Sequence, residues 1–160
     1  MPGRSARYAL HAMLEMALAP DEAVTVASVA GRFGIPQTAL AKVFQQLVRA
    51  GLARGTRGVG GGYRPARRAN DVSVLDVLSV FEPPQASGRC LVALRVDGAC
   101  PRQAGCGLLQ LFDEADELLR CTFASVSLAT LARRTRAPRP PESLVRSTPP
   151  RRARVQPGRR

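Results

Sequence analysis

The hydrophobic residues in the first half of the chain recur with the period of an α-helix. Between Ile35 and Gly51 they stand at i, i+3, i+4, i+7 and i+8, which predicts an amphipathic helix with one buried stripe. The stripe consists of Leu40, Val43, Phe44, Leu47 and Val48. Gly51 ends the predicted helix, and polar and cationic side chains are left on its outward face.

Two earlier helices are predicted by the same kind of pattern. Apolar side chains recur at helical spacing over residues 5–19, and the segment PDEAV then interrupts them. Residues 24–34 predict a short second helix, with Thr25 as its N-cap and Gly34 as a left-handed stop. A short helix, a turn that contains glycine and a second helix with a cationic outer face are typical of a helix-turn-helix.

The segment GTRGVGGGYRP, residues 55–65, places five glycines and two arginines in eleven positions. Its glycine spacing fits neither the dinucleotide-binding fingerprint nor a phosphate-binding loop. The flanking segments LARGT and GYRPA predict the two strands of a hairpin. A thin glycine-rich tip suits the minor groove of DNA, about 6 Å wide, whose negative potential attracts an arginine such as Arg57. We therefore expect a wing, and the first three helices and the wing predict a winged helix-turn-helix.

The second half of the chain predicts a linking helix, a loop and a long helix. The linking helix begins with a capping-box-like pair, Ser73 and Asp76, and ends at Pro83 and Pro84. A loop from Gln85 to Gly107 follows. Beyond it, apolar residues alternate spacings of four and three, as in a coiled coil, and we expect this helix to mediate dimerisation. The seam consists of Leu108, Phe112, Ala115, Leu119, Thr122 and Val126.

The predicted fold class is therefore mainly α, with a small β-hairpin wing and a long C-terminal dimerisation helix. We expect a DNA-binding domain in residues 1–70, the linking helix, loop and dimerisation helix in residues 71–132, and a disordered Arg/Pro-rich tail in residues 133–160.

The formal charge of +12 divides unevenly among these segments. The first holds ten Lys/Arg against three Asp/Glu, the second four against eight, and the tail ten arginines against Glu142. A basic N-terminal module makes a polyanion the expected partner. The tail is either a solvated segment or a source of salt-sensitive, sequence-independent affinity for DNA.

Composition also argues against several classes of function. No apolar run approaches the ~20 residues of a membrane span, and the N-terminal apolar stretch lacks the features of an export signal, so we expect a cytoplasmic protein without membrane contact. With one histidine, no tryptophan and no nucleophile motif, the chain lacks the residues for acid/base or nucleophilic catalysis. We therefore expect neither an enzyme nor a small-molecule substrate.

The candidate DNA contacts lie on the predicted second helix of the helix-turn-helix and on the wing. Gln37 and Thr38 are best placed to read base edges, whereas lysine and arginine at these sites mostly contact phosphates. Solvated surface charge is the alternative for the charged members. The full set is Gln37, Thr38, Lys42, Gln45, Arg49, Arg57, Gly58, Gly60 and Tyr63.

Residues 4–132 resemble a known family, the Rrf-type winged-helix transcriptional regulators of bacteria, which include the iron–sulfur regulators IscR and NsrR. RYALHAMLEMAL is similar to the family's opening helix, and the helix-turn-helix with RGVGGGY is similar to its DNA-binding module. VSVLDVLSVFE resembles its linking helix, and Cys90, Cys100 and Cys106 resemble its cysteine loop. The resemblance implies a homodimer that crosses through the long helix and binds a pseudo-palindromic, double-stranded DNA operator. In several members a [2Fe–2S] or [4Fe–4S] cluster switches this binding.

The chain departs from the family pattern at several positions. The polar run that opens its recognition helix lacks the glutamate often found there, which indicates a different operator sequence. The cysteine spacing is Cys-x9-Cys-x5-Cys, with a longer first gap than usual. Leu109 and Arg7 stand where some members have a histidine or a carboxylate ligand, and His11 stands where one branch has a histidine.

Cys90, Cys100 and Cys106 are accordingly candidate ligands of an iron–sulfur cluster, since thiolates are its normal ligands. Zinc binding, a plain dithiol sensor and the absence of any cofactor are the alternatives. A fourth ligand would come from His11, Cys121, a carboxylate such as Asp113, or a small exogenous molecule. His11 can equally be a surface or interface residue, and Cys121 is expected to be a buried small hydrophobic residue.

The predicted function is that of a homodimeric, sequence-specific transcriptional regulator, switched by an iron–sulfur cluster that senses redox state, nitric oxide or iron. The alternative is a cofactor-free winged-helix repressor whose cysteines are thiol sensors or vestigial.

Overall fold

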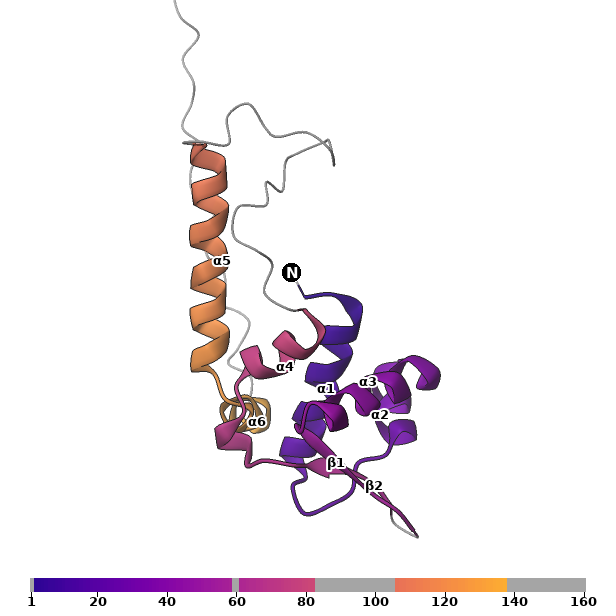
Figure 1. Cartoon of the computed structure of the whole chain (residues 1–160). Coiled ribbons are helices and arrows are strands. Elements are labelled where there is room, and N and C mark those ends of the chain that lie inside the picture. Colours follow the sequence, from indigo (N-terminus) through magenta and orange to yellow (C-terminus); the bar gives the residue numbers. More distant parts are fainter. Residues whose placement is uncertain (1, 59–60, 83–105, 138–160) are drawn as a thin grey trace, which may run out of the picture.

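The computed structural model describes residues 2–58, 61–82 and 106–137, which form six α-helices, one short 3-10 helix and one two-stranded sheet (Figure 1). In chain order these are α1 (Arg4–Leu18), α2 (Val26–Phe33), α3 (Gln37–Arg49), β1 (Ala53–Thr56), β2 (Gly62–Pro65), η1 (Ala69–Asp71), α4 (Val74–Phe81), α5 (Gly107–Ser125) and α6 (Leu128–Arg136). The predicted class, mainly α with a small β-hairpin, is confirmed. Within these ranges, no helix is both long and apolar enough to cross a membrane.

The helix-turn-helix forms where the local signals predict it. Thr25 caps α2, because its Oγ1 accepts the backbone N–H of Ser28 at 3.0 Å in a capping box. This satisfies one of the donors that a helix start leaves unpaired. Gly34 ends α2 in the left-handed conformation, with a φ of 64°. Only Ile35 and Pro36 then separate Gly34 from the first residue of α3, so the turn between the two helices is tight.

Helix α3 buries the stripe that its periodicity predicts, with one exception. Leu40, Val43, Phe44 and Leu47 are buried against the rest of the domain. Val48 was predicted to share this stripe but is 38% exposed, so that prediction is wrong. The reason is its position at the margin of the stripe, where it borders the space between α3 and the hairpin instead of the core.

The predicted hairpin pairs β1 with β2 in antiparallel register, from Ala53 opposite Pro65 to Thr56 opposite Gly62. A bridge from the segment before α2 adds to it, because the backbone N–H and C=O of Val24 both bond to Tyr63, at 2.9 and 2.8 Å. Glycine is needed at position 62, since a Cβ there would lie 2.8 Å from the carbonyl oxygen of Val24. The hairpin is thus held to the helices at its base.

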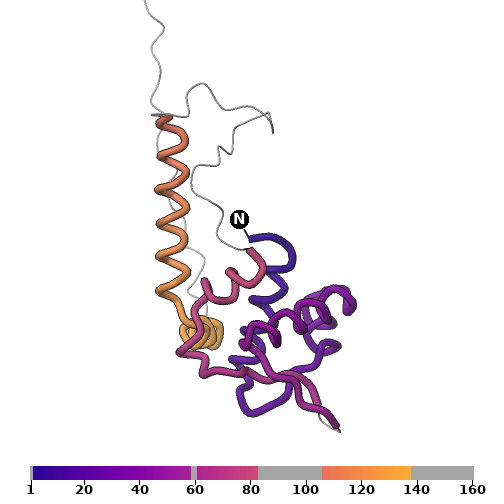
Figure 2. Tube along the Cα trace, in the orientation of Figure 1, coloured from indigo at the N-terminus to yellow at the C-terminus, as the bar shows by residue number. Residues whose placement is uncertain are grey.

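One hydrophobic core joins the helix-turn-helix to α4 and α6. Helix α1 passes through this core, and Met13 and Met16 are fully buried in it. The C-terminal half of the chain contributes Val77 from α4 and Leu128 from α6 to the same cluster. Figure 2 shows α4 and α6 beside α1, whereas α5 extends away from this group of helices. The DNA-binding module therefore depends for its core on residues beyond the wing.

The C-terminal helix is not continuous, contrary to the prediction. Helix α5 ends at Ser125, Val126 is extended (φ −105°, ψ 111°), and Ser127 caps a separate helix, α6. The break is held by two backbone hydrogen bonds of 2.9 Å, from Val74 N–H to the Val126 carbonyl and from Leu128 N–H to the Val72 carbonyl. Val126 therefore does not continue the seam of α5, and the chain turns back toward α1.

Helix α6 also extends beyond the predicted start of the tail. The sequence pattern predicts disorder from residue 133 onward, but residues 133–136 form the last turn of α6. The Arg136 guanidinium donates a hydrogen bond to the carbonyl of Leu18 at the C-terminal end of α1. This contact satisfies a carbonyl that a helix end leaves unpaired, and it attaches the end of α6 to α1.

The capping box of α4 offers a test of how much a local signal stabilises the domain. The Ser73 Oγ accepts the backbone N–H of Asp76 at 3.0 Å, and the Asp76 carboxylate accepts the Ser73 N–H at 2.8 Å. Ser73→Ala should lower the free energy of unfolding by about 1 kcal/mol, a typical value for a lost N-cap. Urea denaturation would measure it, with Ser79→Ala, an exposed serine in the same helix, as control. Equal stability of the two variants would contradict the assigned role of the cap.

Candidate nucleic-acid interface

The exposed face of α3 carries the residues that the sequence analysis predicted as DNA contacts. Gln37, Thr38, Lys42, Gln45 and Arg49 are all exposed. Helix α3 contains no acidic residue. Among the described residues, Lys42 and Arg49 have no carboxylate within ion-pair distance. The face therefore presents hydrogen-bonding groups and uncompensated positive charge.

The hairpin tip has the predicted exposure and backbone conformation on the side that the structure describes. Arg57 and Gly58 are exposed, and Gly58 has a φ of 107°, which side-chain-bearing residues rarely adopt. Gly61 donates its backbone N–H to the Gly58 carbonyl at 2.8 Å, and a Cβ on Gly61 would lie 2.6 Å from the Thr56 carbonyl oxygen. The turn can thus be this tight only with glycine. Gly60, another predicted contact, lies outside the described residues.

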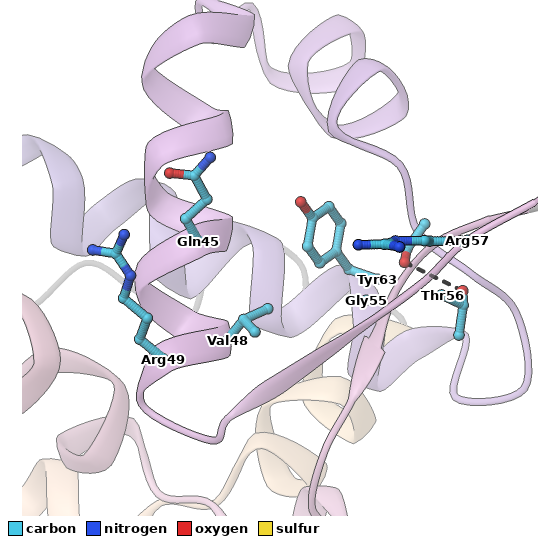
Figure 3. A pocket seen from close by; sticks show the side chains of 8 residues that line it. Gln45, Val48, Arg49, Gly55, Thr56, Arg57 and Tyr63 are labelled. Carbon is cyan, nitrogen blue, oxygen red and sulfur yellow. Dashed lines mark hydrogen bonds between the residues drawn. The ribbon is translucent and has the colours of Figure 1, made fainter.

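A cleft of about 640 Å³ lies between the C-terminal half of α3 and the hairpin (Figure 3). Four of the predicted contacts line it, namely Gln45, Arg49, Arg57 and Tyr63. The sequence analysis missed the other lining residues, which are Val48, Gly55, Thr56 and Gly62. For Gly55 a signal existed in the predicted hairpin, whose register places it directly opposite Tyr63. Gln37 and Thr38 lie at the other end of α3, where the helix begins.

Tyr63 is held in this cleft by a ring stack and by two backbone hydrogen bonds. Its ring stacks on the buried ring of Phe44, with the centroids 4.4 Å apart and the planes inclined by 28°. Its backbone N–H and C=O are both bonded to Val24. Its hydroxyl forms no hydrogen bond to any residue that the structure describes. In Figure 3 the hydroxyl end of the ring points toward α3.

Of the predicted metal ligands, the structure describes Cys106 and His11. Cys106 is the N-cap residue of α5 and is half-buried, while Cys90 and Cys100 lie outside the described residues. His11 is exposed on α1, where its ring packs against Phe33 with centroids 4.4 Å apart. The described ranges contain no group of three or more histidine, cysteine or carboxylate side chains that could hold a metal ion.

Cys121 is exposed, so the prediction that it is a buried small hydrophobic residue is wrong. It lies on α5, none of whose residues is fully buried in the single chain. The Glu117 carboxylate accepts a hydrogen bond from the Cys121 thiol at 3.5 Å and raises the pKa of Cys121. A raised pKa favours the thiol, whereas the thiolate is the metal ligand. Fifteen residues of helix, about 22 Å, also separate it from Cys106, too far to share one cluster within the chain.

A helix-turn-helix with an acid-free outer face, followed by a glycine-rich hairpin with an exposed arginine, defines a winged helix-turn-helix DNA-binding protein. The family model Rrf2, described as an iron-dependent transcriptional regulator, matches residues 3–134, and the chain belongs to this family. A protein of Rhodopseudomonas palustris that bears the name of the HTH-type transcriptional regulator BadM is 33% identical over 128 residues, which are 80% of this chain and 78% of that protein. The predictions of a DNA-binding transcriptional regulator and of a non-enzyme are thereby confirmed.

Two solved structures share the fold. CymR, the global cysteine regulator of B. subtilis, aligns with a TM-score of 0.67 at 21% identity, over 84% of this chain and 97% of that one. IscR of T. potens aligns with a TM-score of 0.67 at 22% identity, over 88% of this chain and 93% of the IscR chain. At this level of identity the likeness concerns the fold alone.

Proposed function

We propose that the protein is a homodimeric, sequence-specific regulator that places α3 in the major groove of its operator and the hairpin tip in the adjacent minor groove. One observation carries this proposal: α3 and the hairpin border the same cleft, and neither element contains an acidic residue. The major groove, about 12 Å wide, admits an α-helix, and a thin hairpin tip fits the narrower minor groove.

The proposed contacts divide according to their position. Gln37 and Thr38 are in the first turn of α3, the part of a recognition helix that reaches base edges. Lys42 and Arg49 contact phosphates, which position the helix without reading sequence. Arg57 enters the minor groove, and Gly58 allows the backbone of the tip to turn without a side chain.

The proposed dimer forms through α5. No residue of this helix is buried in the single chain, yet it presents a row of large exposed apolar side chains. The row consists of Leu108, Leu111, Phe112, Leu118 and Leu119. An apolar surface of this kind marks an interaction site. A two-fold dimer matches an operator whose half-sites lie one helical turn apart, about 34 Å.

The proposed sensor is an iron–sulfur cluster of the [2Fe–2S] or [4Fe–4S] type, held by Cys90, Cys100 and Cys106. The description of the matching family as iron-dependent supports an iron-containing group. The donor type also fits, since thiolates are the usual ligands of such clusters. Cys106 is the N-cap residue of α5, where the helix dipole favours negative charge. When bound, the cluster supplies an iron centre that responds to redox state, nitric oxide or iron supply.

A fourth ligand is still required in this proposal. His11 lies on α1, where its ring packs against Phe33, and the second copy in the dimer could supply it as a ligand. A carboxylate such as Asp113 or a small exogenous molecule is the other source. The alternative function keeps the DNA-binding surface and assigns the cysteines to zinc, to thiol sensing or to no role. We place the protein in the cytoplasm, where its operator would be.

The wing assignment is tested by Arg57→Ala. Removing this guanidinium should weaken binding to an operator selected from random duplexes by roughly 5- to 150-fold, or about 1–3 kcal/mol, the value of one well-made base contact. Gly58→Val should weaken it comparably, because valine is strained at a φ of 107°. A gel-shift titration measures both.

Arg4→Ala is the matched control, since Arg4 is exposed at the first turn of α1. The end of α1 that approaches the hairpin is its C-terminal end, about 20 Å away along a fifteen-residue helix. If Arg57→Ala and Gly58→Val bind the operator as tightly as Arg4→Ala does, the minor-groove assignment is wrong.

A further inference from the structure

We propose that the cleft between α3 and the hairpin seats one phosphodiester strand of the operator, and that the Tyr63 hydroxyl and the Gln45 amide hold one of its phosphates. This inference rests on the proposed DNA-binding mode and assigns a ligand to a part of the surface that does not read bases. The group that the site binds is a phosphate oxygen, whether it belongs to DNA or to free phosphate.

The placement follows from the shape of the duplex. If α3 lies in a major groove and the hairpin tip lies in the adjacent minor groove, the sugar–phosphate strand that separates the two grooves must pass between them. The space between α3 and the hairpin is the 640 Å³ cleft. Apart from Arg57, which continues into the minor groove, its lining groups therefore meet phosphates and deoxyriboses and not base edges.

The cleft has the chemistry for such a strand. None of its lining residues is acidic, and Arg49 and Arg57 contribute two guanidinium groups without a carboxylate partner among the described residues. The exposed Val48 offers apolar surface for a deoxyribose. Gly55 and Gly62 contribute no side chains, so the cleft stays open between the strands and α3.

Tyr63 is the best-prepared donor in this cleft. The stack on Phe44 and the two hydrogen bonds to Val24 fix its ring and backbone before any ligand arrives. Ordering it on binding therefore costs little conformational entropy. The Thr56 hydroxyl, by contrast, already donates to the Gly62 carbonyl at 3.3 Å. Figure 3 shows Gln45 on the turn of α3 toward which the Tyr63 hydroxyl points, so the two groups can hold one phosphate from either side.

The neutral donors and the arginines should differ in how their removal changes the salt dependence of binding. Tyr63→Phe keeps the stack and loses only the hydroxyl. It should weaken binding roughly 10-fold, the lower range for a hydrogen bond to a charged group, and leave the slope of log affinity against log salt unchanged. Arg49→Gln should lower this slope by about one, because one phosphate contact with counterion release is lost.

The experiment measures fluorescence anisotropy across a salt series with the full chain, a selected operator and a random-sequence duplex. Because phosphate contacts carry no sequence information, Tyr63→Phe should lower the affinity for both duplexes by the same factor. Tyr8→Phe, at the only other tyrosine of the chain, is the control and should change neither. Unchanged affinity of Tyr63→Phe for both duplexes, or a loss confined to the operator, would overturn the proposal.

A second measurement locates the phosphate. In a series of operator duplexes, each with one neutral methylphosphonate linkage, wild-type protein should lose affinity at one linkage between the two grooves. At that linkage the methylphosphonate should not weaken the binding of Tyr63→Phe any further. At the other linkages it should weaken the variant and the wild type by the same factor. Equal further losses at every linkage would contradict a shared contact.

Three outcomes separate this inference from a free-anion site and from a failure of the proposed DNA-binding mode. If inorganic phosphate binds in a Tyr63-dependent manner while the variant binds DNA normally, the cleft serves a free anion and the strand is wrongly assigned. If Thr38→Ala and Arg57→Ala also leave operator binding unchanged, the DNA-binding mode itself fails. If those two variants weaken binding and Tyr63→Phe does not, only the assignment of the cleft fails.

Discussion

An aspartate in place of Leu119 should convert the dimer into monomers that bind the operator roughly 10²- to 10⁴-fold more weakly. Leu119 lies within the exposed apolar row of α5 and is 47% exposed in the single chain. In a helix pair this position would be buried, and an unpaired carboxylate there would be strongly unfavourable. A monomer then loses the second half-site, and the loss corresponds to the avidity of two linked binding modules. Analytical ultracentrifugation and anisotropy on the same samples would measure both effects.

Gln110→Asp provides the matched control for this variant. It introduces the same side chain into the same helix, but Gln110 precedes Leu119 by nine residues and therefore lies on the opposite face, about 180° away. It should sediment as a dimer and bind the operator like the wild type. A wild-type protein that is monomeric at micromolar concentration would end the dimer proposal, as would a dimeric Leu119→Asp variant.

Replacing Cys90, Cys100 and Cys106 together with alanine should remove the visible absorbance of the anaerobically purified protein. Its affinity for DNA should also become insensitive to oxidant and nitric oxide. The wild type should change its affinity by roughly 5- to 150-fold with the state of the cluster, the usual range of coupling between two sites.

The structure provides a route for this coupling. The segment that carries the three cysteines connects α4 to α5 and ends at Cys106, the N-cap of α5. Beyond the other end of α5, the Val126 carbonyl accepts a hydrogen bond from Val74, the first residue of α4. The Leu128 N–H donates to Val72, the residue before the α4 N-cap. Helix α4 packs on α1 in the DNA-binding domain. In the proposed dimer, a change at Cys106 would therefore act on the helix that sets the spacing of the two recognition helices.

Two further variants define the ligand set. Cys121→Ala should retain the absorbance, because its thiol has a raised pKa and lies far along α5 from Cys106. His11→Ala should bleach the protein if the second copy supplies this residue, and should change nothing if a carboxylate or exogenous ligand is used. If the wild type stays colourless when made anaerobically with iron and sulfide, and still binds its operator fully, the cluster proposal is wrong and the DNA-binding function alone survives.

Sequence alone was sufficient wherever the determining interactions are local. The Thr25 and Ser73 capping boxes, the Gly34 stop and the periodic stripe of α3 depend on residues within about one turn of each other. The hairpin likewise depends on glycines that are adjacent in the chain. The helix-turn-helix, the wing and the linking helix could therefore be predicted, and so could the exposed side chains of α3 and the hairpin tip.

Tertiary structure decided the features that depend on distant partners. The periodicity after Leu119 is compatible with one long helix, but Val126 and Leu128 bond to the backbone of residues 72–74 and the chain breaks there. Leu128 then enters the core around α1, and Arg136 reaches Leu18. The cleft also joins residues that only the packing of the hairpin brings beside α3: Val48 borders this space instead of the core, and Tyr63 stacks on Phe44. Local propensity can start and stop a helix, but a break that exchanges helical hydrogen bonds for long-range ones depends on the folded partner being in place.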